Sequence, residues 1–214
     1  MIAIRRELDA ILRGHPSAGS WAIVLGCGLT YGGVMGIFGG RFGQVMYSAV
    51  KVPLLLLATL LLSLPSYFVL NTLLGLRADF AAAWRAVVAS QAGLTIILVA
   101  LAPITAFWYV SSSNYRLAIL FNAVMFSVAS AGAQGILRRG YGPLIAQDPK
   151  HRWLLRTWIF LYAFIGIQMG WNLRPFVGSP DEPVRFFREG PWENAYVVVA
   201  RVLWEAVAIR PSAR

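Results

Sequence analysis

Five long stretches of this chain contain no charged residue, and every Lys, Arg, Asp and Glu lies between or beyond them. Four of the stretches reach the roughly 20 apolar residues that a helix needs to cross a bilayer, and the last, with 17 residues, is marginal. Because lipid offers an open backbone no hydrogen-bond partner, such stretches fold as helices. The pattern therefore predicts an all-α, polytopic integral membrane protein with five transmembrane helices. We place them at about 16–40, 52–76, 86–115, 117–137 and 157–173.

An amphipathic segment precedes this five-helix domain, which covers residues 16–173. Within residues 1–15, Ile4, Leu8 and Ile11 fall on one helical face, and charged residues occupy the other positions. This arrangement predicts an interfacial helix in the headgroup layer. A solvated, frayed terminus is the alternative.

A second amphipathic segment follows the domain, in residues 174–214. From Trp192 onward, apolar residues recur at three- to four-residue spacing, which predicts an interfacial helix after a proline-rich loop. Insertion of residues 192–210 as a sixth span is less favoured. It would bury Arg201 and Glu205 at a cost of about 2.5–3.5 kcal/mol each.

The positive charge indicates a membrane partner. The chain is 58% hydrophobic with a formal net charge of +10, but its basic residues stand singly or in pairs beside apolar spans. Nucleic-acid binding is therefore not expected, and anionic lipid headgroups are the expected partners. The side that bears the N-terminus has more Lys and Arg close to the membrane, so the N-terminus is predicted to be cytoplasmic.

Basic residues are also candidates for direct contact with lipid headgroups or with a partner. Most of them lie around the predicted loop before the fifth span, and one lies just after that span. They are Arg138, Arg139, Lys150, Arg152, Arg156 and Arg174.

Small residues recur every four positions in three of the predicted helices. Such faces let two helix backbones approach closely, which drives helix association in lipid. In the fourth helix these positions are Ser127, Ala131 and Gly135. The predicted helix-packing interface consists of Gly28, Gly32, Gly36 and Gly40 in the first helix and Gly166 and Gly170 in the fifth. Its partner is left open among a helix of the same chain, a different protein and a second copy.

Uncharged polar residues also recur at multiples of four within individual helices. One interpretation is a hydrated cavity or a path for a small polar solute. The other, which we favour, is hydrogen bonding between helices, worth on the order of 0.6–2 kcal/mol per bond. The residues are Gln91, Thr95, Asn122, Ser130, Gln134, Gln168 and Asn172.

Candidate chemistry is sparse along the chain. No charged residue lies inside a predicted span, which argues against proton-coupled pumping, and the serines in the spans have no His or Asp beside them to activate them. His15 and His151 are expected to be interfacial side chains, and Cys27 is the single cysteine. We therefore predict no catalytic residue, no metal site and no cofactor.

Several segments resemble known membrane proteins. KVPLLLL, SLPSYF and LAPITAFW, at the second and third spans, resemble the Yip-type family of five-helix membrane proteins, over roughly residues 20 to 170. The tail after the fifth span departs from that family. QMGWNLRPFVGSP, VRFFREGPWENAY and SSSNYRLAILFNAV resemble segments of uncharacterised bacterial multi-pass membrane proteins that share a WxLRPFxGxP segment.

The Yip-type resemblance implies a non-enzymatic role in binding other membrane proteins or organising membrane. Together with the small-residue faces, it leads us to expect a non-catalytic subunit, scaffold or assembly factor in the bacterial inner membrane. The alternative function is a small oligomeric channel or facilitator for a polar solute. Other integral membrane proteins, or further copies of this chain, are the expected partners.

Overall fold

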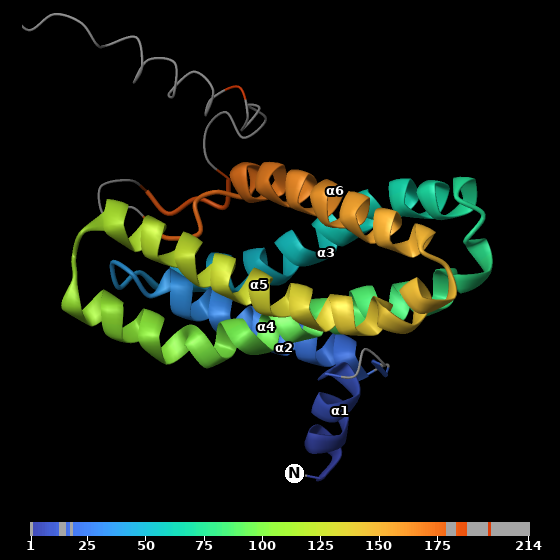
Figure 1. Ribbon diagram of the computed structural model, residues 1–214. Coiled ribbons are helices and arrows are strands. Elements are labelled where there is room, and N and C mark those ends of the chain that lie inside the picture. Colours follow the sequence, from blue (N-terminus) through green and yellow to red (C-terminus); the bar gives the residue numbers. More distant parts are fainter. Residues whose placement is uncertain (1, 13–15, 18, 179–182, 188–196, 198–214) are drawn as a thin grey trace, which may run out of the picture.

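The computed structural model describes residues 2–12, 16–17, 19–178, 183–187 and 197 (Figure 1). All regular secondary structure in these residues is helical. In order, the elements are α1 (Ile2–Leu12), α2 (Gly19–Gly36), α3 (Phe42–Leu73), the short 3-10 helix η1 (Arg77–Asp79), α4 (Phe80–Ser111), α5 (Tyr115–Gln147) and α6 (Lys150–Asn172). His15 and the predicted C-terminal amphipathic helix, with its possible insertion as a sixth span, lie outside the described residues.

Four helical segments are long and apolar enough to cross a membrane. They are Phe42–Leu73, Arg77–Ser111, Tyr115–Gln147 and Lys150–Asn172. The prediction of an all-α, multi-pass membrane protein is confirmed to this extent. The first predicted span corresponds to α2, which has 18 residues and is not one of the four.

Local sequence explains where several helices begin and end. The side chain of Asn114 accepts a hydrogen bond from the Leu117 backbone N–H at 3.2 Å, and so caps the start of α5. Gly75, with φ of 77°, follows the end of α3 in the left-handed conformation that glycine adopts easily. Gly39 and Gly40 also have positive φ, in the turn after α2.

Helix bounds differ from the charge-free stretches. α3 begins at Phe42 and therefore includes Lys51, while α5 continues through Arg138 and Arg139 to Gln147. A helix satisfies its own backbone wherever it lies, so it can continue past a charged residue. Charges mark the predicted edge of the apolar stretch but not the end of the helix. α2, in contrast, is shorter than its charge-free stretch. It ends at Gly36, so Gly40 is not part of its face.

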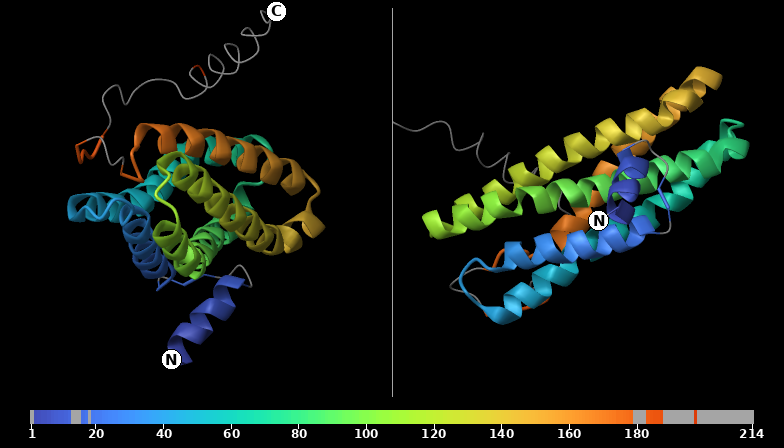
Figure 2. Two further views of the ribbon diagram at one scale, coloured as in Figure 1. Left: turned by 90° about the vertical axis from the view of Figure 1, so that its left-hand side faces the viewer. Right: turned by 90° about the horizontal axis from the view of Figure 1, so that it is seen from below.

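The helices α2 to α6 form an elongated bundle and alternate in direction (Figures 1 and 2). α2 packs on α3 and α4, α4 packs on α5, and α6 packs mainly on α3. α1 lies outside the bundle against α4 and α2. We call the end where α3 and α5 finish and α6 begins the His151 end. The opposite end, where α5 begins and α6 finishes, is the Arg174 end.

Two large apolar clusters fill the bundle, and a third, smaller one joins α1 to α2 and α4. One large cluster surrounds Tyr31 and Leu98 and joins α2, α3, α4 and α5. The other surrounds Tyr67, Tyr141 and Trp158 and joins α3, α4, α5 and α6 near the His151 end. Both large clusters place tyrosine hydroxyls among apolar side chains, where a hydroxyl needs a hydrogen-bond partner.

Candidate functional site

The glycine face of α2 packs against α3 of the same chain. A Cβ on Gly32 would collide with the backbone carbonyl oxygen of Ser48, and a Cβ on Gly36 would lie 2.6 Å from the Cα of Val45. A Cβ on Gly28 would lie 3.3 Å from the Cβ of Pro53. The two backbones can approach this closely only because the glycines lack side chains. The sequence leaves the partner of this face open, and in the structure a helix of the same chain, α3, covers it.

The other three predicted packing glycines have different surroundings. A Cβ on Gly166 would lie 3.5 Å from Cγ2 of Thr59, so α6 also packs on α3 through a small residue. Gly170 and Gly40 would meet no atom within 4 Å, and Gly40 lies in the turn after α2. The six predicted glycines therefore do not form one interface.

The small-residue face of α5 is exposed. Ser127, Ala131 and Gly135 are all exposed, and a Cβ on Gly135 would meet no atom within 4 Å. The buried small residues of α5, such as Ala129 and Ala133, lie on a different face of the helix. In an apolar stretch of 18 residues, 22% of α5 is buried, against 61% of the segment that contains α4 and 17% of α6. This face of α5 has the spacing for close helix packing and no described helix of the chain packed on it.

The predicted cavity residues mostly pair within the bundle. Gln91 donates to the hydroxyl of Tyr162 at 2.6 Å, and Thr95 donates to the carbonyl of Ala92 at 2.9 Å. Gln168 donates to the side-chain oxygen of Asn172 at 3.0 Å. Ser130 and Gln134 are half-buried on α5.

Asn122 joins a polar group between helices. Its amide donates to the hydroxyl of Tyr109 at 2.5 Å, and its side-chain oxygen accepts from the hydroxyl of Tyr31 at 3.4 Å. These bonds connect α5 with α4 and α2. A cavity of about 1010 Å³ lies between α5 and α6 near the Arg174 end. Of the seven predicted cavity residues, Asn122 is the one that borders it.

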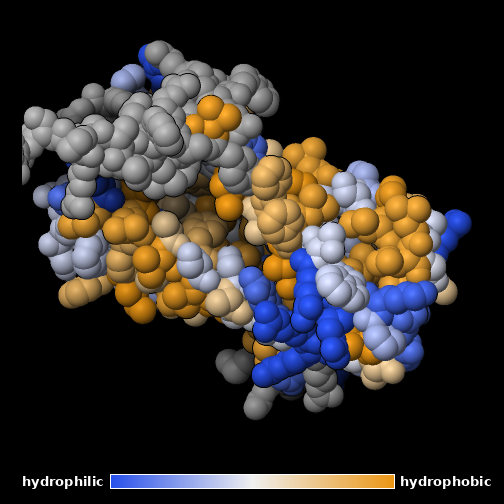
Figure 3. All heavy atoms as spheres, turned by 45° about the horizontal axis from the view of Figure 1, so that its top comes forward, coloured by the Kyte–Doolittle hydropathy of each residue, from blue (hydrophilic) through white to orange (hydrophobic). Residues whose placement is uncertain are grey.

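The basic residues gather at the His151 end. Arg138, Arg139, Lys150, Arg152 and Arg156 are all exposed there, and Figure 3 shows hydrophilic side chains gathered over this part of α5 and α6. Arg174 is separate from this group, since it follows α6 at the opposite end of the bundle. The guanidinium carbon of Arg174 lies 3.2 Å from the centre of the Trp171 ring.

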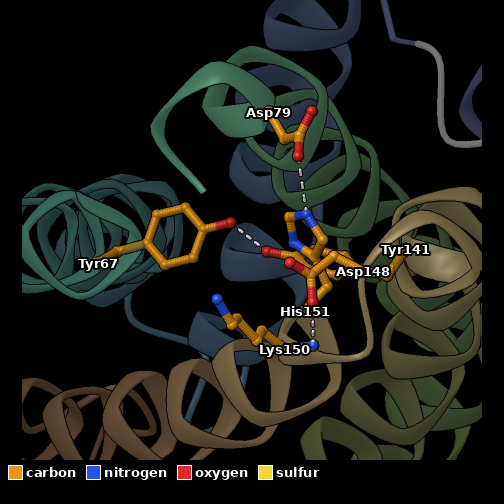
Figure 4. Close-up of polar contacts among 6 residues, drawn as sticks. All are labelled: Tyr67, Asp79, Tyr141, Asp148, Lys150 and His151. Atoms are coloured by element: carbon orange, nitrogen blue, oxygen red, sulfur yellow. Dashed lines mark hydrogen bonds and ion pairs between the residues drawn. The ribbon is translucent and has the colours of Figure 1, made fainter. Parts of the chain in front are cut away.

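His151 is buried among polar groups, whereas the sequence led us to expect an interfacial side chain. Its Nε2 atom lies 3.0 Å from Oδ2 of Asp79, and its imidazole packs edge-on against the ring of Tyr141 (Figure 4). The hydroxyl of Tyr141 is hydrogen-bonded to that of Tyr67. Side chains from η1, α3, α5 and α6 thus meet at one point. The Nδ1 atom of His151 is buried with no hydrogen-bond partner among the described residues.

Lys51 is also buried, although its charge had suggested a loop position. Its Nζ atom donates to the backbone carbonyl of Pro175 at 2.7 Å. One and two turns earlier on α3, Ser48 and Gln44 both donate to the carbonyl of Phe176, Gln44 at 3.1 Å. These bonds fasten the segment after α6 to the first half of α3.

Sequence reasoning missed both of these contacts. Asp79 and His151 are 72 residues apart, and Lys51 and Pro175 are 124 residues apart. The available signal for the first contact was that both residues flank predicted spans on the same side of the membrane. For the second contact we find no signal in the sequence.

Among the described residues, no group of three or more His, Cys, Asp or Glu side chains could hold a metal ion. The features with functional potential are therefore the exposed α5 face, the basic His151 end and the cavity near Arg174. Comparison with known proteins found no matching family model, curated protein or solved structure. The Yip-type resemblance stays a prediction from the sequence segments that suggested it.

Proposed function

We propose that this protein is a non-catalytic integral membrane subunit, scaffold or assembly factor that binds another membrane protein through the exposed small-residue face of α5. The proposal rests on one observation: Ser127, Ala131 and Gly135 are spaced for helix packing and are exposed along one side of an apolar helix. In lipid, apolar contact alone gives helices little reason to associate, and small residues provide the close packing that does.

The proposal includes five spans, with α2 as the first, and a cytoplasmic N-terminus in a bacterial inner membrane. The close packing of α2 on α3 supports a shared path through the bilayer, since a helix of 18 residues with no charge can be buried beside a longer one. The exposed basic residues of the His151 end support its placement on the cytoplasmic side. There they would contact anionic headgroups or a soluble part of the partner.

A small oligomeric channel is the second candidate. The observation that favours it is the position of Asn122 at the border of a large cavity. The pairing of Gln91 with Tyr162 and of Gln168 with Asn172 favours the scaffold, because these amides bond within the protein.

The test is the mass and protein content of the native particle, extracted from its own membrane in mild detergent. Wild-type protein should be recovered in a larger assembly with other membrane proteins. Gly135→Leu should weaken that assembly roughly 5- to 150-fold, since a side chain forced into a close contact costs about 1–3 kcal/mol.

Gly26→Leu is the matched control. Gly26 is an exposed helical glycine of α2, and a Cβ there also meets no atom within 4 Å. This variant should assemble normally. Recovery of the Gly135→Leu variant in an unchanged assembly would refute the proposed surface. A closed particle of this chain alone, with solute flux in liposomes, would support the channel instead.

A further inference from the structure

The cavity near the Arg174 end is open along one side of the bundle. It lies between α5 and α6 because α6 packs mainly on α3 and touches α5 over few residues. Its volume of about 1010 Å³ is at the upper end of the roughly 300–1,000 Å³ range of sites that enclose whole small molecules. Ile119 of α5 and Ile167 of α6 border it and are 46% and 57% exposed. A ligand therefore enters it sideways, from the bilayer that surrounds these two helices.

The cavity is a slot that follows the helix direction. On α5, residues that border it recur every three or four positions, at Tyr115, Ile119, Asn122 and Phe126. Positions with this spacing form one continuous stripe, which here rises about 16 Å along the helix. The hydrocarbon core of a bilayer is roughly 30 Å thick, so each leaflet fills about 15 Å of it. The slot therefore begins where α5 begins and has about the length of the acyl chains of one leaflet.

The walls of the slot are mostly apolar. They include Phe126 of α5, Met35 of α2, Leu55 of α3 and Ile167 of α6. Gly170 of α6 leaves further space, since a Cβ there would meet no atom within 4 Å. Wall atoms that face an empty space lose their dispersion contacts, and hydrocarbon restores these contacts without needing a hydrogen-bond partner.

Asn122 is the polar group deep in this wall, and it is bonded within the protein. Its amide nitrogen donates to the hydroxyl of Tyr109 at 2.5 Å and to the carbonyl of Ala118 at 2.8 Å, which engages both amide hydrogens. Its side-chain oxygen accepts from the hydroxyl of Tyr31 at 3.4 Å. A buried water molecule needs about 2–4 polar partners. The deep part of the slot therefore suits a hydrocarbon chain better than a file of water molecules or a polar headgroup.

We propose that the slot between α5 and α6 binds a phospholipid of the adjacent leaflet through one of its acyl chains. The headgroup lies where α5 begins and α6 ends, and the chain runs along Ile119 towards Phe126. This site is separate from the α5 face proposed for protein binding, because Ser127, Ala131 and Gly135 do not border the cavity.

A photoprobe at the edge of the slot tests the proposal. Benzoylphenylalanine replaces Ile119 in one variant and Leu120 in the other; Leu120 is 60% exposed and does not border the cavity. The full chain is extracted from its own membrane, exchanged exhaustively into detergent and irradiated, and mass spectrometry identifies the adducts. The probe at Ile119 should still form a phospholipid adduct. The probe at Leu120 should not, because bulk lipid exchanges for detergent.

Three outcomes would overturn the proposal. Phospholipid adducts that are equally retained or equally lost at the two positions would show no bound lipid in the slot. An adduct between the Ile119 probe and residues 188–214 of the same chain would assign the slot to the C-terminal segment. An adduct with another protein would assign it to a partner.

A second variant fills the slot. Gly170→Leu should fold normally, because a Cβ at this position meets no atom within 4 Å. The phospholipid retained per protein after detergent exchange should fall roughly 5- to 150-fold, the change that corresponds to about 1–3 kcal/mol of overpacking. Gly26→Leu, at a helical glycine with equally open surroundings, is the matched control and should retain as much lipid as the wild type.

The fraction of folded monomer, measured in the same samples, separates lost binding from lost folding. Unchanged lipid retention in folded Gly170→Leu would also overturn the proposal. Assembly with other proteins is read separately through Gly135→Leu, so a failure of one proposal is distinguishable from a failure of the other.

Discussion

The Nε2 atom of His151 and the Oδ2 atom of Asp79 lie 3.0 Å apart and join the start of α6 to the short helix before α4. The imidazole is fully buried, whereas the carboxylate is 35% exposed. The ring of Tyr141 packs against the imidazole, and Tyr67 closes the group from α3 (Figure 4). A buried polar ring is tolerated here because the carboxylate satisfies one of its nitrogens.

Asp79→Ala should destabilise the fold. The substitution leaves both imidazole nitrogens of His151 without a partner, at a cost of about 1–3 kcal/mol for the newly unsatisfied atom. Thermal unfolding in detergent should show a lower Tm. Asp9→Ala removes a carboxylate that is exposed on α1 and should leave Tm unchanged. Equal Tm values for the two variants would contradict a stabilising role for this contact.

Gly32→Leu should disrupt packing between α2 and α3 inside the chain. Its side chain would collide with the backbone at Ser48 and Ala49, which cannot move as a flexible side chain can. The free energy of unfolding should fall by about 3 kcal/mol or more, at the upper end of what an oversized side chain costs in a packed core. Gly26→Leu, on the same helix, points into open space and should be tolerated. The measurement is the fraction of folded monomer after detergent extraction; a similar yield for both variants would argue against this packing.

Lys51→Met should loosen the segment that follows α6. The variant keeps an apolar chain of similar length but removes the shorter of two hydrogen bonds to the Pro175 carbonyl, leaving the one from Gln44 at 3.3 Å. Hydrogen exchange at residues 176–178 should become faster than in the wild type, by about 5- to 150-fold for a lost bond of 1–3 kcal/mol. Lys150→Met, at an exposed lysine of the opposite end, is the control. Unchanged exchange in Lys51→Met would show that Ser48 and Gln44 hold the segment alone.

Docking of α1 should weaken in acid. The carboxylate of Glu7 accepts hydrogen bonds from Ser20 at 2.6 Å and from Ser17 at 2.7 Å, and these bonds lower the pKa of Glu7 below its ordinary value. A carboxyl whose pKa is lowered by folding contributes stability above its unfolded pKa and loses it as the pH falls through its folded pKa.

Hydrogen exchange of residues 6–12 at a series of pH values, corrected for the intrinsic rate, measures this effect. Protection should fall as the pH drops below about 4.3, the usual pKa of a glutamate. Glu7→Gln should give low protection that does not vary over this range. The same pH dependence in wild type and Glu7→Gln would place its origin at another residue.

The helical class of the protein could be predicted from the spacing of charges, but the helix ends could not. A charge-free stretch of sufficient length requires a helix in lipid, and the described residues contain four helices of the required length and apolarity. Lys51 shows why the helix ends differ. It marks the edge of a predicted span, yet α3 continues past it and its ammonium group donates to the carbonyl of Pro175. A distant backbone group decided whether that charge could be buried.

The small-residue faces of α2 and α5 could also be predicted only in part. The four-residue spacing of Gly28, Gly32 and Gly36 and that of Ser127, Ala131 and Gly135 are equally visible in the chain. The structure shows that the first set faces α3 and that the second set is exposed. Spacing identifies a face that can pack closely, but it does not show what the face meets.

By itself, the sequence determined the helical fold class, the membrane environment and the faces suited to close packing. These follow from local rules, because helix periodicity and the absence of hydrogen-bonding solvent act on each stretch separately. Only the tertiary structure decided which glycine face is covered, that His151 meets Asp79, and that a cavity lies between α5 and α6. Those outcomes depend on how each helix is rotated and which helices become neighbours. That choice joins residues far apart in the chain, so no local pattern records it.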